Sequence, residues 1–275
     1  MPYPLIIIPV FNALAKLEAC LESVARTIPD QAKVLLIDDD STDNGVQPLL
    51  QSWVYANPSK RSFITNAQNL GFVATANLGL RLAEHDVVLL NSDTEVTPGW
   101  LECLKDCLDS DTSIATATPW SNNGEIVSIP DFCVANSPPG DADAVATTIA
   151  SCGETTYPEL PTAVGFCMAI SSRAIETIGV FDEATFGRGY GEENDFCQRA
   201  EQAGFRNVLC DNAYVVHHGG ASFGPIGLKP DENSMQRLLN KHPDYQQKVS
   251  DYIATDPLAS RREEILACLE CVKIG

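Results

Sequence analysis

Basic residues are scarce in this sequence. Its 275 residues include 18 lysines and arginines against 37 aspartates and glutamates, for a formal net charge of -19. A chain with this charge repels polyanions, so binding to nucleic acid or to an anionic membrane surface is not expected. A small anionic substrate would need a metal ion or a helix terminus to hold it.

Long apolar runs and dinucleotide motifs are also lacking. The apolar run in MPYPLIIIPVFN is too short for a signal peptide or a membrane span, so we expect a first buried strand, no transmembrane segment and a cytoplasmic protein. No G-x-G-x-x-G follows an apolar run, which argues against dinucleotide oxidoreduction. Ten cysteines are present, but they fall mostly inside apolar runs without a compact framework, which predicts buried thiols in a reducing compartment rather than disulfides.

Short β-branched runs alternate with helical periodicity through residue 118. This pattern predicts an α/β fold in which a mostly parallel sheet carries helices on both faces. The expected strands are Leu5–Ile8, Val34–Ile37, Ser62–Thr65, Val87–Leu90 and Ile114–Ala117. The expected helices are a first one around Leu14 to Val24, then Val46–Tyr55, Phe72–Ala83 and Gly99–Leu108.

The second half of the sequence is less regular. Residues 119–161 are rich in turn formers, so an irregular surface excursion is expected there. Beyond it we expect a strand in AVGFCMAIS, a helix over 172–178 and a glycine-rich loop, GRGYG. A helix opening at Glu192, two short strands in the region 207–216 and polar helices toward the C-terminus complete the prediction.

Acidic residues follow two of the expected strands, and ligands of open parallel sheets bind beyond the carboxyl ends of the strands. The second strand runs into DDDSTD. Residues 41–43 suit N-caps of the next helix, but Asp38 ends the strand itself, where its carboxylate could accept hydrogen bonds from a nucleobase or a ribose.

The fourth strand runs into NSDTE, where Thr97 and Pro98 are expected to start the next helix. That assignment leaves a different role for Asp93. Carboxylate oxygens suit Mg²⁺ or Mn²⁺, and either ion could join Asp93 to the phosphates of an anionic substrate.

Two further candidates lie in the second half. In GYGEENDFCQRAEQAG, Glu193 shares the apolar stripe of its helix with Phe196 and Cys197, which places an inward carboxylate where a general base could act. Glu192 and Asp195 should lie to the side as exposed first-turn acids, with Asp195 paired to Arg199. The pair His217 and His218 ends a strand, and one of the two is expected to contact a metal or a phosphate.

Taken in order, these motifs resemble glycosyltransferase family 2, the inverting nucleotide-sugar transferases with the GT-A fold. The resemblance covers about residues 4–224 and rests on IIIPVFN, LLIDDDSTD, NLGFVATAN, LLNSDTEV, GFCMAIS, GVFDE, GEENDFCQRAEQAG and VVHHGGAS. It is closest in pattern to transferases of rhamnose, galactofuranose and related surface-polysaccharide sugars. It implies a GT-A domain over residues 1–224, divided into a nucleotide-binding half (1–118) and an acceptor and catalytic half (119–224), with a helical C-terminal extension over 225–275.

The resemblance also implies roles for individual residues. Glu193 would be the catalytic base, and Asp93 and His217 would hold Mg²⁺ or Mn²⁺. The donor, a UDP-, dTDP- or GDP-sugar, would contact these residues: Pro9, Phe11, Asp38, Asn69, Gly71, Asn91, Ser92, Asp93 and Glu192. The acceptor would be a glycan or a lipid-linked glycan, which would bring a cytoplasmic enzyme to the inner face of the membrane through partners.

The sequence departs from the pattern of this family at two positions. Two alternative functions therefore stay open. Asn91 stands where many relatives have aspartate, and the base is a glutamate where many have aspartate. A catalytically inactive module that binds a sugar or a nucleotide is therefore one alternative. A sugar-phosphate nucleotidyltransferase is the other, although PVFNALAK supplies no glycine-rich basic phosphate loop after the first strand.

Overall fold

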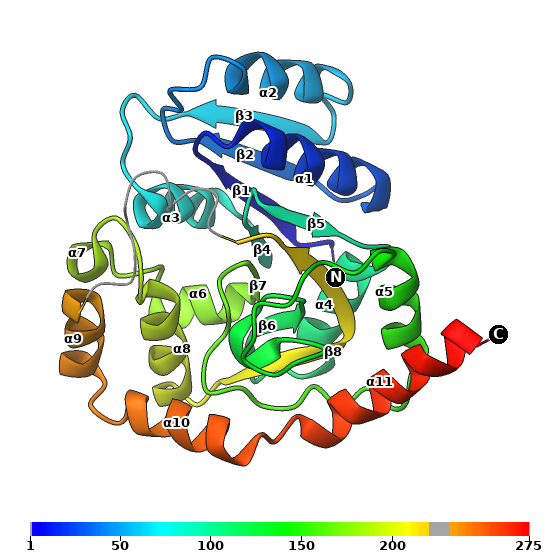
Figure 1. Cartoon of the computed structure of the whole chain (residues 1–275). Coiled ribbons are helices and arrows are strands. Elements are labelled where there is room, and N and C mark those ends of the chain that lie inside the picture. The colour runs from blue at the N-terminus through cyan, green and yellow to red at the C-terminus, as the bar shows by residue number, and fades with distance from the viewer. Residues whose placement is uncertain (1, 220–231, 275) are drawn as a thin grey trace.

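The computed structural model describes residues 2–219 and 232–274, which form a sheet between two layers of helices (Figure 1). The sheet order is β3-β2-β1-β4-β7-β6-β8-β5. Its strands are β1 (Leu5–Val10), β2 (Val34–Asp38), β3 (Arg61–Thr65), β4 (Val87–Leu90), β5 (Thr94–Val96), β6 (Ile114–Trp120), β7 (Cys167–Ile170) and β8 (Arg206–His217). Strands β7 and β5 run antiparallel to their neighbours, and the other pairings are parallel, which confirms the mostly parallel sheet.

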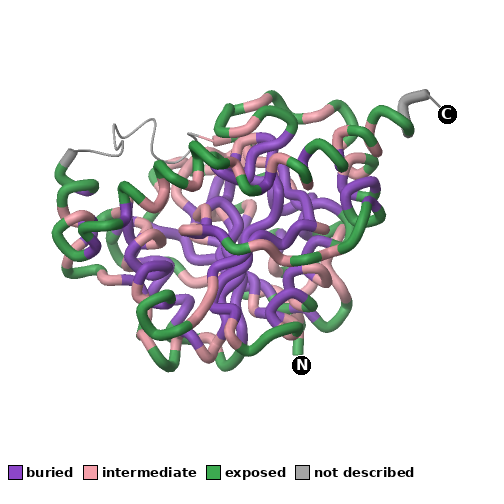
Figure 2. The backbone as a smooth tube through the Cα atoms, turned by 90° about the horizontal axis from the view of Figure 1, so that it is seen from below, coloured by how far each residue is buried: buried purple, intermediate pink, exposed green. Residues whose placement is uncertain are grey.

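The helices cover both faces of the sheet, as expected. Their bounds are α1 (Leu14–Thr27), α2 (Val46–Tyr55), α3 (Phe72–Leu82), α4 (Trp100–Ser110), α5 (Ala142–Ser151), α6 (Ser172–Ile178), α7 (Glu183–Phe186), α8 (Glu192–Gln202), α9 (Glu232–Lys241), α10 (Tyr245–Thr255) and α11 (Ala259–Ile274). Successive side chains of a strand point to opposite faces, so Ile6 and Ile8 join the core under α1, α2 and α4, whereas Ile7 joins the core under α3 and α8. Figure 2 shows this buried centre from below, ringed by more exposed helices.

Three predictions of local structure were wrong. Residues 119–161 are not wholly irregular, because they contain α5, whose N-cap Asp141 accepts a hydrogen bond from the backbone of Ala144. The two strands expected within 207–216 are one long strand, β8. The helix after residue 43 begins without a side-chain cap, since its N-cap is Gly45 and the Asp43 carboxylate accepts only from the backbone of that glycine.

The C-terminal helices wrap around the lower edge of the domain, from α9 beside α8 to α11 beside α5 (Figure 1). The boundary predicted at residues 224 and 225 lies outside the described residues and stays a prediction. Within the described residues, no helix is both long enough and apolar enough to cross a membrane.

One disulfide contradicts the expectation that the cysteines are unpaired. Cys152, at the end of α5, is bonded to Cys268 in α11, across a sequence separation of 116 residues. The other cysteines of the described residues are free, including the exposed Cys133. The sequence offered no framework spacing for this pair because the two partners meet only when α11 has folded back onto α5.

Removing this disulfide should lower stability. Closing so long a loop restricts the unfolded chain, so Cys152→Ser is expected to reduce the free energy of unfolding by about 2–4 kcal/mol. Chemical denaturation under non-reducing conditions measures the change. Cys133→Ser is the matched control and should change little, and an equal loss in both variants would contradict a role for the disulfide.

Candidate active site

The end of β2 supplies a buried carboxylate, as predicted. Asp38 is fully buried, and its two oxygens accept hydrogen bonds from the backbone N–H of Ser41 (3.1 Å) and from Nε2 of Gln47 (2.6 Å). The neighbouring strand β1 places Pro9 and Val10 beside Ile37 and Asp38, so Phe11 follows at the same edge. Pro9, Phe11 and Asp38 thus lie together at the carboxyl ends of β1 and β2.

Asp39 organises the loop that contains Asn69 and Gly71, a role that the sequence analysis missed. Its buried carboxylate accepts from Asn66 Nδ2 (2.8 Å) and from the backbone N–H groups of Leu70 (2.7 Å) and Gly71 (2.8 Å). Its carbonyl accepts from Asn69 Nδ2 at 2.8 Å. The Asn69–Gly71 loop is therefore fixed to the same sheet edge as Asp38.

The glycine-rich loop before α8 packs against the Asn69–Gly71 loop. Gly71 has a φ of +91°, and a Cβ there would lie 2.9 Å from the Cα of Arg188, so only glycine fits. Arg188 donates from Nη1 to the carbonyl of Asn69 at 3.2 Å and accepts at its own carbonyl from the N–H of Phe72 at 3.1 Å. In a chain so short of cations, this arginine is a second feature that sequence reasoning missed.

The segment after β4 differs from its predicted form. Thr97 does not cap a helix, because α4 begins at Trp100 after Gly99, and the Thr97 hydroxyl donates to the carbonyl of Tyr214. The residues 94–96 form β5, which pairs with the end of β8 and sets Thr94 opposite His217. This pairing over a long sequence separation brings Asp93 to the histidine.

The side chains of Asp93 and His217 lie close together, and both are of a kind that can ligate a metal ion. The Asp93 carboxylate is nearly buried, and its Oδ1 lies 3.7 Å from Nε2 of His217. His217 Nδ1 lies 2.6 Å from the carbonyl of Asn123, and since a carbonyl only accepts, Nδ1 carries the hydrogen. Nε2 of the neutral ring is then an electron-pair donor turned toward Asp93. His218 instead pairs with Glu95 at 2.6 Å and is exposed.

These groups fit a divalent ion that completes its shell with substrate. An oxygen and an imidazole nitrogen are ligands for Mn²⁺ or Mg²⁺, and such ions commonly take only a few protein ligands beside phosphates and water. Within residues 2–219 and 232–274, no group of three or more histidine, cysteine or acidic side chains could hold a metal by itself. Ser92 is buried beside Asp93, and Asn91 is half-buried.

The start of α8 carries two adjacent carboxyl groups, Glu192 and Glu193, whose pKa values are both raised. Burial raises the pKa of Glu192 well above its ordinary value, and the charge of Glu193 and a hydrogen bond between the two side chains raise it further. The predicted exposure of Glu192 and Asp195 was wrong, because Glu192 (4% exposed) and Asp195 are buried, whereas Glu193 is half-buried and adjoins Gly165. Burial, followed by the charge of Glu125, also raises the pKa of Glu193.

This pKa predicts a pH dependence for any reaction in which Glu193 acts as a base. The ionised form is the active one, so kcat should fall as pH decreases through a pKa above the ordinary glutamate value of 4.5. Glu125→Gln removes a like charge and should move that acidic limb to lower pH. The kcat–pH profiles of both proteins measure the shift, and an unmoved limb would show that another group controls it.

A short segment before β7 joins these parts. The carbonyl of Phe166 accepts from the N–H of Asn91 at 2.9 Å, and its ring stacks on His217 with centroids 5.2 Å apart. A Cβ on the preceding Gly165 would lie 3.9 Å from Cγ of Glu193. Asp93 with His217, the end of β4, and the carboxyl groups of Glu192 and Glu193 therefore meet around Gly165 and Phe166.

Solved structures share this architecture at low sequence identity. GalNAc-T7 with UDP, GalNAc and Mn²⁺ has a TM-score of 0.64 and 16% identity over 90% of this chain and 51% of its own, so this chain spans about half its length. Mannosyltransferase PcManGT of Pyrobaculum calidifontis with GDP-Man and Mn²⁺ gives 0.60 and 15%, over 100% of this chain and 76% of its own. TarS of S. aureus, residues 1–349 with UDP-GlcNAc, gives 0.57 and 15%, over 98% and 92%.

Sequence comparison gives the family directly. No curated protein matches the chain. The model of the family described as "Glycosyl transferase family 2" matches residues 5–179, which include Asp38 and Asp93 but end before Glu193 and His217. Because this match covers more than half of the sequence and the GT-A fold agrees with it, the chain belongs to glycosyl transferase family 2.

Proposed function

We propose that this protein is an inverting glycosyltransferase that moves a sugar from a nucleotide-diphosphate sugar to a hydroxyl of a glycan or a lipid-linked glycan. The observation that carries the proposal is the convergence on Gly165 and Phe166. Gly165 adjoins Glu193, and Phe166 stacks on His217 and accepts a hydrogen bond from the N–H of Asn91. Our proposed base, Glu193, and our proposed metal ligands, Asp93 and His217, thus adjoin one small segment, which is consistent with both acting in one displacement reaction.

The nucleotide would bind at the ends of β1 and β2. Asp38 presents a buried carboxylate for the N–H of a base or for a ribose hydroxyl, and Pro9 and Phe11 supply apolar surface beside it. The loop Asn69–Gly71, held by Asp39, would close the same pocket. The structures with UDP or GDP sugars named above make a UDP-, dTDP- or GDP-sugar our proposed donor.

The diphosphate would lie over Asp93, with Ser92 and Asn91 beside it. Mg²⁺ or Mn²⁺ bound by Asp93 and His217 would neutralise the charge that develops on the departing diphosphate. The hydrogen bond from Nδ1 of His217 to Asn123 keeps Nε2 turned toward this position. The ring of Phe166 against His217 limits its rotation.

Glu193 would act on the acceptor. Its ionised carboxylate accepts the proton of the acceptor hydroxyl while that oxygen bonds to the anomeric carbon from the face opposite the diphosphate. The bond from the anomeric carbon to the diphosphate oxygen breaks, and the diphosphate leaves with the electron pair. Glu192, in its protonated form, would donate a hydrogen bond to Glu193 and hold it in place.

One observation favours a second function, a catalytically inactive module that binds sugars or nucleotides. Asn91 is an amide at the edge where a second carboxylate would strengthen metal binding, and no group of three or more histidine, cysteine or acidic side chains in the described part of the chain could hold a metal. The cytoplasm stays our proposed location because eight cysteines of the described residues are free, although the Cys152–Cys268 disulfide is an observation against a reducing compartment.

Isothermal titration calorimetry with a panel of UDP-, dTDP- and GDP-sugars, with and without Mn²⁺, tests the proposal. Tight binding that needs Mn²⁺, together with release of nucleoside diphosphate on incubation, is the expected result. Metal-dependent binding without cleavage in the presence of acceptor glycans would favour the inactive module. Binding of free glycan with no binding of any nucleotide sugar would exclude the proposed reaction.

A further inference from the structure

Helix α8, which carries Glu193, begins without a side chain that caps its N-terminus. Its N-cap is Gly191, at a φ of +99°, and no side chain caps the first turn. The loop leading into it contains further residues with positive φ, namely Gly187, Gly189 and Tyr190. The first turn is closed by the backbone N–H of Asp195, which donates to the carbonyl of Gly191 at 2.9 Å. Whatever fixes Asp195 therefore fixes the turn that bears Glu193.

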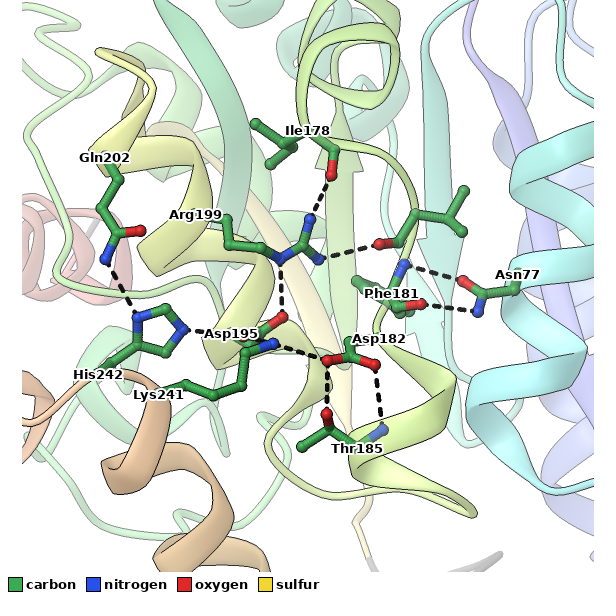
Figure 3. A network of polar contacts seen from close by, with 11 residues as sticks. Asn77, Ile178, Phe181, Asp182, Thr185, Asp195, Arg199, Gln202, Lys241 and His242 are labelled. Atoms are coloured by element: carbon green, nitrogen blue, oxygen red, sulfur yellow. Dashed lines mark hydrogen bonds and ion pairs between the residues drawn. The ribbon is translucent and has the colours of Figure 1, made fainter.

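Asp195 is fixed by the C-terminal helices. Its side chain is fully buried and accepts from Arg199 Nε (2.8 Å), Lys241 Nζ (2.6 Å) and His242 Nε2 (2.8 Å), as Figure 3 shows. Burial opposes its ionisation, but hydrogen bonds from Lys241, His242 and Arg199 outweigh burial and keep the pKa of Asp195 below its ordinary value. These are charge-assisted hydrogen bonds, the stronger kind.

The donors are themselves held in place. Gln202 donates from Nε2 to Nδ1 of His242 at 3.3 Å, which fixes the tautomer that points a hydrogen from Nε2 at Asp195. Lys241 also pairs with Asp182 at 2.7 Å (Figure 3). Arg199 donates to the carbonyls of Ile178 and Val180 at 2.5 and 2.9 Å.

The residue between Glu193 and Asp195 is anchored in the same way. Oδ1 of Asn194 accepts from the hydroxyl of Tyr245, in α10, at 2.8 Å and from the hydroxyl of Thr162 at 2.8 Å. The two residues that follow Glu193 are thus both held by side chains from residues 241–245. None of the residues assigned above to donor or metal lies in that segment.

We propose that Lys241 and His242 are positioning residues for Glu193, which act through Asp195 and the first turn of α8. The inference rests on the proposed function, because it needs Glu193 to be the base. A displacement of about 1 Å in a catalytic group can cost about 100-fold in rate. The C-terminal helices would then set the rate of the chemical step and leave donor binding to the opposite half of the sheet.

The test compares two lysines that both join the C-terminal helices to α8. Lys241→Ala and His242→Ala should lower kcat by about 10- to 100-fold, with the dissociation constant for the donor and Mn²⁺ unchanged. His242→Gln keeps an N–H donor for Asp195 and should recover most of the rate. Lys248→Ala is the matched control: Lys248 pairs with Glu201 at 2.8 Å, at the other end of α8, and its loss should leave kcat unchanged.

The outcomes separate the two claims. A wild-type protein that cleaves none of the donors contradicts the proposed function itself. An active wild type whose Lys241 and His242 variants keep kcat within twofold overturns the positioning role, as does an equal fall for Lys248→Ala, which would indicate a general loss of stability. If the alanine variants fail to fold, Lys241→Met keeps a side chain of similar length and removes the ammonium group, which bonds Asp195 and lies over the ring of Phe186. A kcat for Lys241→Met that falls about 10-fold or more, while His242→Gln keeps most of the rate, supports the positioning role, and a kcat within twofold of the wild type overturns it.

Discussion

Replacing Glu193 by glutamine should lower kcat by about 100- to 10,000-fold while the donor still binds in the presence of Mn²⁺. The amide keeps the size and the hydrogen bond with Glu192, but it cannot take the proton of the acceptor hydroxyl. In the wild type we expect that proton to be accepted by the half-buried carboxylate of Glu193, which adjoins Gly165 at the start of α8. Steady-state transfer rates with a verified donor, together with calorimetric donor affinity, measure both parts of the expectation.

A conservative control separates charge from reach. Glu193→Asp keeps the carboxylate one methylene farther back, so it should retain more activity than glutamine and less than the wild type. Near-normal turnover by Glu193→Gln would show that another group takes the proton. A parallel loss of donor affinity would instead place Glu193 in the donor site.

Asp93→Asn should weaken Mn²⁺-dependent donor binding by at least about 10- to 100-fold, the range seen when even the partners of metal ligands are removed. The substitution removes the carboxylate that faces Nε2 of His217 at 3.7 Å. Titration of Mn²⁺ into protein with saturating nucleoside diphosphate gives the apparent metal affinity. The same titration with His217→Ala should show a loss of similar kind.

Asn91→Asp is the opposite substitution in the same segment and should tighten Mn²⁺ binding. Asn91 follows β4 directly, and its backbone is fixed by Phe166, so a carboxylate there adds charge with little change in fold. Unchanged affinity in both Asp93→Asn and Asn91→Asp would contradict the metal site at this edge. A gain in affinity accompanied by a lower kcat would show that the amide tunes product release.

Local patterns in the sequence predicted most of the sheet and its covering helices. The helix Val46–Tyr55 and the strand Val87–Leu90 have their predicted bounds, because each is a strongly periodic or continuous apolar run. Strand β5 and the hydroxyl of Thr97 could not be predicted, because both depend on pairing with β8, more than a hundred residues away. Helix α5 left a signal that could have been used, an Asp141 cap followed by Ala146 and Ile149 on one face.

In the candidate site, too, features that depend on local sequence patterns could be predicted and those that depend on long-range contacts could not. Asp38 and His217 could be nominated because each ends an apolar strand, and Asp93 because it closely follows one. The orientation of the acids in α8 could not, since Asp195 is buried by Lys241 and His242 from helices whose position the sequence does not reveal. Asp39 and Arg188 were missed because their roles lie in contacts with the backbone of the Asn69–Gly71 loop.

The stereochemistry of donor cleavage tests the central claim most directly. Proton NMR of the sugar released from an anomerically pure nucleotide sugar, recorded before mutarotation, gives the configuration of the first product. Attack from the Glu193 side, opposite a diphosphate held at Asp93, predicts an inverted anomeric centre. A first product with retained configuration would contradict a direct displacement assisted by a single base.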